Sequence, residues 1–192
     1  TTGSQVNANG SGGRVALYAT ESDGMFAGRV RAPCGFLGSA TKPTTSSDGV
    51  GRTGTVYLQA GDGLGDFILD NEIYTVGSST TIKTDSTDGA DIAFHHVIVT
   101  NRSRLNLPAG LTLRVTGDWR TTGGRLTADA STHVYFEGAD TANVCGDNTF
   151  GSVTCVAPGK AFRFGTGASD NFAIPEGCSL VWQGAANNLI SL

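Results

Sequence analysis

Apolar and polar residues alternate with a period of two in many short segments of this chain. Leu111, Leu113 and Val115 are separated by single residues, and Val134 and Phe136 repeat the pattern farther along. Such alternation is typical of a β-strand with one buried face. The longer spacing of an amphipathic helix is missing. The pattern therefore predicts an all-β protein.

The alternating segments belong to an internal repeat. Residues 103–117, SRLNLPAGLTLRVTG, align without gaps on residues 124–138, GRLTADASTHVYFEG, at an offset of 21. Residues 172–184 align on residues 105–117 at an offset of 67. One such unit cannot bury its apolar edge alone, so successive units must stack, like strand on like strand. The repeat predicts a right-handed parallel β-helix, a β-solenoid with rungs of about 21 residues.

The alignment also predicts which side chains stack inside the solenoid. Phe162 and Phe164 follow Val134 and Phe136 by 28 residues, which requires a seven-residue insertion between Cys145 and Cys155. Trp182 is expected to fill the core rather than to present a platform for sugars. The two predicted interior ladders are Leu113, Val134, Phe162, Leu180 and Val115, Phe136, Phe164, Trp182.

One solenoid domain is expected over residues 1–192. Residues 1–60 should supply N-terminal strands and a loop, and residues 61–192 should supply the stacked rungs, with an inserted loop at 140–158. The N-terminal strands are predicted at 14–19, 26–32 and 55–60.

Charge and hydropathy exclude two classes of partner. The net charge of −4 gives no clustered basic surface for nucleic acid. No run of about 18 apolar residues is available to span a membrane. The chain begins at Thr1 without the basic start and apolar core of a signal peptide, so we expect any signal peptide to have been removed or to lie upstream in a longer precursor.

The four cysteines are Cys34, Cys145, Cys155 and Cys178. An even number of cysteines in an acidic chain rich in Thr and Gly fits an oxidising compartment. Cys145 and Cys155 enclose a short polar segment, and closing a short loop costs little chain entropy, so a disulfide is predicted between them. Cys34 and Cys178 lie far apart along the predicted stack and are expected to be unpaired.

Three long segments carry a resemblance to a known class of repeat protein. They are GSGGRVALYAT, GTVYLQAGDGLGDFILDN and HHVIVTNRSRLNLPAGLTLRVTGDW, and together they cover most of the chain. They resemble the repeat-rich right-handed parallel β-helix regions of large bacterial secreted and cell-surface proteins. The resemblance implies an extracellular β-helix, secreted or on the cell surface, and it implies no particular activity.

One outward lane of the predicted sheet carries the side chains best suited to bind a ligand. Arg114, Tyr135 and Arg163 are predicted to follow one another, with His133 and Glu137 flanking Tyr135. A guanidinium group pairs with a carboxylate or a sulfate, and an aromatic ring can stack on a sugar. This lane predicts binding of an acidic polysaccharide or cell-surface glycan, although simple packing of solvated side chains also explains it.

An enzymatic interpretation uses the same residues. His133 or Tyr135 would act as general base or acid beside Arg114 or Arg163, as in a polysaccharide lyase. A glycoside hydrolase needs two carboxylates at a defined spacing, and none can be placed. The favoured hypothesis is therefore an extracellular structural or adhesion module, and the alternative is a carbohydrate-active β-helix enzyme. No nucleotide or cofactor motif is recognisable.

Two groups of residues are of types that bind metal ions. Asp85, Asp88 and Asp91 offer oxygen ligands suited to calcium, but their spacing is not that of a known calcium loop. Asp also favours turns for local hydrogen-bonding reasons, and this interpretation is preferred. His95 and His96 are expected to lie on a strand and point to opposite sides, which would keep them from sharing one ion.

Overall fold

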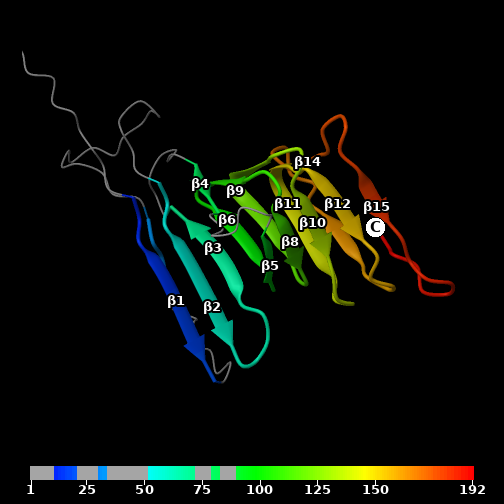
Figure 1. Ribbon diagram of the computed structural model, residues 1–192, viewed down its shortest axis with the longest axis horizontal. Coiled ribbons are helices and arrows are strands. Elements are labelled where there is room, and N and C mark those ends of the chain that lie inside the picture. Colours follow the sequence, from blue (N-terminus) through cyan, green and yellow to red (C-terminus); the bar gives the residue numbers. More distant parts are fainter. Residues whose placement is uncertain (1–10, 21–29, 34–51, 72–78, 83–89) are drawn as a thin grey trace, which may run out of the picture.

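The computed structural model describes residues 11–20, 30–33, 52–71, 79–82 and 90–192. In these residues every regular element is a β-strand, and most strands run parallel. They stack along one axis as a β-solenoid of about four turns, with a spacing of about 22 residues (Figure 1). The predicted all-β class and solenoid fold are confirmed.

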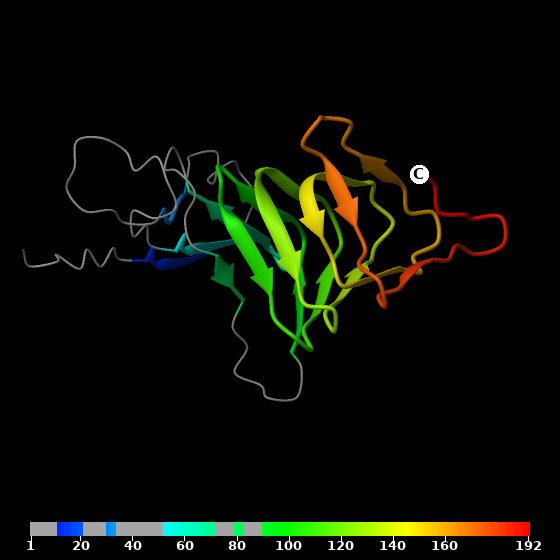
Figure 2. The same ribbon diagram turned by 90° about the horizontal axis from the view of Figure 1, so that it is seen from above.

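Each turn contributes three strand segments, so the solenoid has three faces (Figure 2). Face 1 contains β3 (Asp66–Asp70), β6 (Val97–Thr100), the first halves of β9 (Trp119–Ala128) and β11 (Ala142–Thr149), and β13 (Phe162–Phe164). Face 2 contains β4 (Thr80–Thr81), β7 (Arg104–Leu107), the second halves of β9 and β11, and β14 (Asn171–Ala173). Face 3 contains β5 (Asp91–Phe94), β8 (Thr112–Val115), β10 (His133–Phe136), β12 (Ser152–Cys155) and β15 (Leu180–Trp182).

Face 1 is extended at its N-terminal edge by two more strands. These are β1 (Arg14–Ala19) and β2 (Thr55–Ala60), which pair in parallel. Strand β2 then pairs with β3 in the antiparallel direction. The strands predicted at 14–19 and 55–60 are thus confirmed. Of the strand predicted at 26–32, residues 26–29 lie outside the described residues and residues 30–32 form no strand.

The repeat alignment gives the correct register in the first complete turns. Leu113 lies opposite Val134, and Val115 lies opposite Phe136, as the offset of 21 predicts. On face 2 Leu105 lies opposite Leu126 by the same offset. All six side chains are buried in one continuous core. Burying apolar surface between the three faces is what holds the turns together.

The alignment fails in the next turn. Val134 is followed on face 3 by Val153, which lies opposite Leu180. Phe162 instead lies on face 1, opposite Ala142. The predicted ladders are therefore wrong for Phe162 and Phe164. They give the right register for Leu180 and Trp182, but Leu180 is exposed instead of buried. Residues 140–158 are not an inserted loop, because they form β11 and β12 in the stack.

A buried asparagine explains this error. Asn148 occupies the inward position of face 2 that Leu126 fills one turn earlier. Its Oδ1 accepts a hydrogen bond of 2.8 Å from Trp119 Nε1, and its Nδ2 donates to the carbonyl oxygens of Cys145 and Gly146 at 3.1 and 3.0 Å. These bonds satisfy the polar side chain inside the core. The polar residue breaks the apolar alternation, so the strand looked like a loop in the sequence.

The structure corrects the predicted disulfide. Cys145 and Cys155 are free thiols. Cys155 points into the core from face 3, whereas Cys145 is half-buried on face 1, with Sγ 3.6 Å from the hydroxyl oxygen of Thr122. The two thiols are on different faces because the segment between them is folded as strands. Cys178 is free, as predicted, and Cys34 lies outside the described residues.

Alkylation of the native protein is expected to distinguish these thiols. Cys145 and Cys178 should react with iodoacetamide, whereas Cys155 should react only after unfolding, because burial blocks access and raises the pKa of its thiol. Peptide mass spectrometry of labelled native and denatured samples measures the difference. Recovery of a Cys145–Cys155 crosslinked peptide under non-reducing conditions would contradict the strand assignment.

A buried lysine stabilises the connection between faces 3 and 1. Lys160 is fully buried, and its Nζ donates hydrogen bonds to the carbonyl oxygens of Thr116, Glu137 and Asp140 at 3.0, 2.8 and 3.0 Å. Burial lowers the pKa of Lys160 because it disfavours the charged form. The three carbonyl groups belong to earlier turns, so one side chain links three levels of the stack.

Candidate functional site

Arg114 is the centre of a polar network on the outward side of face 3. Its Nε lies 2.9 Å from Asp91 Oδ1 and its Nη2 lies 3.0 Å from Asp91 Oδ2, while Nη1 donates to Glu137. Its guanidinium carbon lies 5.0 Å from the ring centre of Tyr135. Hydrogen bonds to Asp91 and Glu137 raise the pKa of Arg114. One guanidinium group thus joins β5, β8 and the end of β10.

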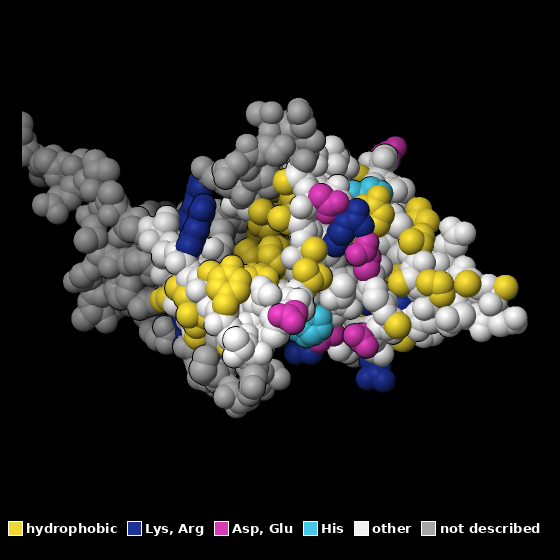
Figure 3. Space-filling view, turned by 60° about the horizontal axis from the view of Figure 1, so that its bottom comes forward, with side chains coloured by type: hydrophobic (Ala, Val, Ile, Leu, Met, Phe, Trp, Pro, Cys, Tyr) yellow, Lys and Arg dark blue, Asp and Glu magenta, His cyan; other side chains and the backbone are white. Residues whose placement is uncertain are grey.

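His133 and Tyr135 form a stacked pair beside this network. Their ring centres are 4.3 Å apart with an interplanar angle of 13°. His133 Nε2 lies 2.7 Å from Thr154 Oγ1 on the next strand. Burial lowers the pKa of His133, which favours the neutral ring. The surface view shows basic side chains lying between acidic ones near a histidine, with hydrophobic side chains scattered around them (Figure 3).

The structure brings four of the five predicted ligand-binding residues together. Arg114, His133, Tyr135 and Glu137 are neighbours on face 3. Arg163 is not among them, because β13 belongs to face 1, where Arg163 lies opposite Asn143. In the outward lane its expected place is taken by Thr154, which is followed by Val181. One guanidinium against two carboxylates leaves this network without the positive charge that an acidic polysaccharide requires.

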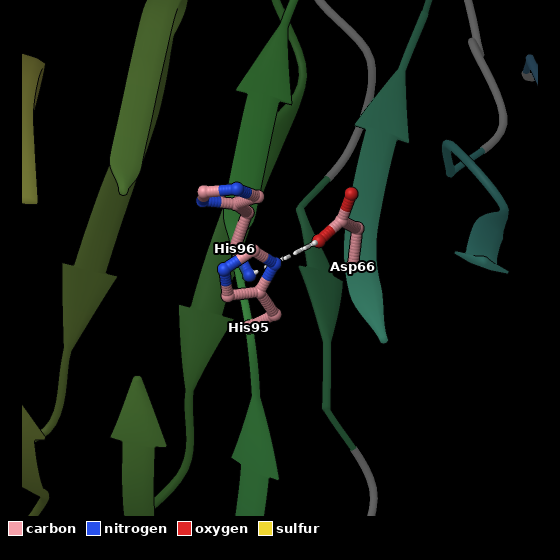
Figure 4. Close-up of side chains that lie close together, drawn as sticks. All are labelled: Asp66, His95 and His96. Carbon is pink, nitrogen blue, oxygen red and sulfur yellow. Dashed lines mark hydrogen bonds and ion pairs between the residues drawn. The ribbon is translucent and has the colours of Figure 1, made fainter. Parts of the chain in front are cut away.

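A second polar cluster lies at the corner between faces 3 and 1 (Figure 4). Asp66 begins β3, and His95 and His96 lie between β5 and β6. His95 Nδ1 is 3.4 Å from Asp66 Oδ1, and the two histidine ring centres are 3.8 Å apart. The prediction that the two rings point to opposite sides is wrong, because this backbone turns a corner and is not an extended strand.

The hydrogen bonding of His96 decides what this cluster can bind. One possible ligand atom from each of Asp66, His95 and His96 lies within 4.8 Å of the others, so the residue types suit a transition metal. The backbone N–H of Asp118, however, donates to His96 Nδ1 at 2.7 Å. The neutral ring then carries its proton on Nε2, and neither nitrogen offers a free lone pair. A shared ion would require His96 to break this bond, so the cluster is not a preformed metal site.

The predicted calcium ligands are only partly described. Asp91 pairs with Arg114, which occupies both of its carboxylate oxygens. Asp85 and Asp88 lie outside the described residues.

The two histidines with lowered pKa values predict how stability depends on pH. Burial lowers the pKa of both His96 and His133 in the folded chain, so the unfolded chain binds protons first as the pH falls below about 6.5. The free energy of unfolding should therefore decrease between pH 7 and pH 5, by at most about 1.4 kcal/mol per pH unit for each histidine. Urea denaturation at several pH values measures this slope.

Matched variants assign the slope to these residues. Asn can keep the acceptor of His96 Nδ1 and Gln can keep the polar group of His133 Nε2, so His96→Asn with His133→Gln should flatten the profile above pH 5. The carboxylates of Asp118 and Asp129, whose pKa values are lowered by hydrogen bonds and, for Asp118, by Arg120, lose their contribution only at lower pH. An unchanged slope in the double variant would contradict the assignment.

A surface hollow of about 330 Å³ lies at the corner between faces 1 and 2. Arg102 is in the turn between β6 and β7, Arg104 begins β7, and Arg125 lies opposite Arg104 on β9. Asp147 continues this lane on β11, with Oδ2 2.8 Å from Arg125 Nε. All four side chains line the hollow.

Sequence reasoning did not identify this hollow as a site. The signal was present, because Arg104 and Arg125 are aligned at the offset of 21 in the clearest repeat. The sequence pattern does not reveal that Asp147 lies on a strand of the stack or that Arg102 lies in a left-handed turn, so the site cannot be assembled from it.

Comparison of the chain with protein-family models, curated proteins and solved structures finds no match. No helix in the described part of the chain has the length and apolar character to cross a membrane.

Proposed function

We propose that this chain is a non-catalytic β-solenoid module of a secreted or cell-surface protein, and that it holds polysaccharide on an outward face. A solenoid presents long, regular faces along its axis, which suits an extended polymer. The extracellular location rests on the resemblance to bacterial surface repeats. It draws no support from disulfides, since the three cysteines that are described are free.

We favour a non-catalytic role because the side chain of Arg114 is already paired within the protein. A lyase needs a guanidinium group that faces the substrate carboxylate and a base that can reach the substrate proton. Here Arg114 already donates hydrogen bonds to Asp91 and Glu137. The ring of His133 stacks on Tyr135 and contacts Thr154. These contacts join successive strands, so they favour a structural role for face 3.

A polysaccharide panel tests this proposal by measuring binding and product release on the same samples. Retention of at least one polysaccharide without cleavage products supports a binding module. Product formation that disappears in His133→Ala or Tyr135→Phe would show that the chain is an enzyme. Absence of retention on the whole panel would overturn the binding function.

A further inference from the structure

The arginine hollow at the corner of faces 1 and 2 has an excess of positive charge. Three guanidinium groups line it against the single carboxylate of Asp147. Asp147 pairs with Arg125, and Arg102 and Arg104 have no ion-pair partner among the described residues. The whole chain has a net charge of −4, so this local excess runs against its overall charge.

This arrangement does not favour the fold by itself. Arg104 and Arg125 lie directly opposite one another on neighbouring strands, and like charges in such positions destabilise a sheet. Arg102 adopts a φ of 63°, a left-handed conformation that is uncommon for a residue with a Cβ. Residues that disfavour the fold locally, without a compensating contact, are typical of functional sites.

The hollow leaves open space above the backbone of Gly123. Gly123 and Gly124 form part of the lining, but a Cβ at Gly124 would clash with the carbonyl oxygen of Val99. Gly123 has a φ of 67°, and a Cβ placed there would meet nothing within 4 Å. The space over Gly123 is therefore open, and the three arginines line the same hollow.

We infer that this hollow binds an anionic group of a polysaccharide, either the carboxylate of a uronic acid or a sulfate ester. A guanidinium group presents two parallel N–H donors, which match the oxygen pairs of both anions. Arg102 and Arg104 supply the unpaired donors, and Arg125 is oriented by Asp147. The polysaccharide class rests on the proposed function, whereas the preference for an anion rests on the arginines alone.

Binding to matched charged and neutral polymers tests the inference. Binding of the full chain to dextran sulfate, polygalacturonate, unsubstituted dextran and duplex DNA is measured by biolayer interferometry. The variant is Arg102→Asn with Arg104→Gln, because Asn tolerates the left-handed backbone at position 102. The control is Arg163→Gln, an exposed arginine on face 1 that does not line the hollow.

The wild-type chain and the control are expected to bind at least one anionic polymer and not dextran. The double variant should bind about tenfold more weakly or worse, as expected when charge-assisted hydrogen bonds are lost. Its thermal stability should be equal to or higher than that of the wild type, because repulsion with Arg125 is relieved. A merely structural role for these arginines would instead lower stability.

Four outcomes would overturn the inference. Unchanged affinity in the double variant would exclude the hollow, and tighter binding to duplex DNA than to dextran sulfate would exclude a polysaccharide as the natural ligand. Binding of neutral polysaccharides alone would refute the anion site but leave the proposed function standing. Failure to bind any polysaccharide would refute both.

Discussion

Replacing Val134 with aspartate is expected to lower the free energy of unfolding by more than about 3 kcal/mol. Val134 is completely buried between Leu113 and Val153, at the middle of the apolar ladder of face 3. An aspartate there either buries an unpaired charge or takes up a proton at a large cost. A loss of this size is a large part of the stability of a small domain.

Thermal and urea denaturation of Val134→Asp measure this loss, and Thr127→Asp provides the matched control. Thr127 is exposed on β9, so the same residue type is introduced into a strand without being buried. The control should remain within about 0.5 kcal/mol of the wild type. Equal stability of the two variants would mean that Val134 does not face the core.

Replacing Lys160 with methionine is expected to cost about 2–4 kcal/mol, because several buried carbonyl groups would lose a charge-assisted donor. Methionine keeps an unbranched apolar side chain but offers no N–H group, so the carbonyl oxygens of Thr116, Glu137 and Asp140 lose their bonds to Nζ. The loss should appear as a lower denaturation midpoint. It should also appear as faster amide exchange in the turns joined by this corner.

Arg163→Met is the control for Lys160→Met. Arg163 is exposed and lies three positions after Lys160 in the same turn of the solenoid. The control therefore removes a positive charge without leaving a buried carbonyl group unpaired. Its stability should stay close to that of the wild type. If Lys160→Met were as stable as the control, the hydrogen bonds of Lys160 would not contribute to the stability of the connection between faces 3 and 1.

The clear repeat made much of this fold predictable from the sequence. On strands β8 and β10 the inward positions are all apolar, so the offset of 21 aligned Leu113 with Val134 correctly. The match at an offset of 67 likewise placed Leu180 in the right ladder. Stacked turns repeat their side-chain environments, which is why a gapless alignment carries the register.

The turn made by β11 and β12 could not be predicted in this way. Its core contains Asn148, and its connection through Phe150 and Gly151 is short, so both its pattern and its length differ from the repeat. The wrong disulfide followed from this, since Cys155 was assigned to a loop instead of the core. The hydrogen bond from Trp119 to Asn148 joins neighbouring turns of the solenoid, so it leaves no recognisable pattern in the local sequence.

The candidate sites were predicted less well than the fold. The outward residues Arg114, His133 and Tyr135 were correctly placed together, but the partner that occupies Arg114 from the preceding strand, Asp91, was not recognised. The arginine hollow needs residues from three turns and a left-handed turn. Such a site can be predicted only when the strand register is known for each turn that contributes residues to it.

Backbone proton contacts measured by NMR test the register of the solenoid most directly. Strands β10 and β12 are adjacent and parallel, with Val134 opposite Val153, so their backbone protons should show strong interstrand contacts at a strand spacing of about 4.8 Å. The same spectra should connect Val153 with Leu180. Contacts that place the backbone of Phe162 next to that of Val134, with none from Val153, would contradict the stacking of β11 and β12 as a full turn of the solenoid.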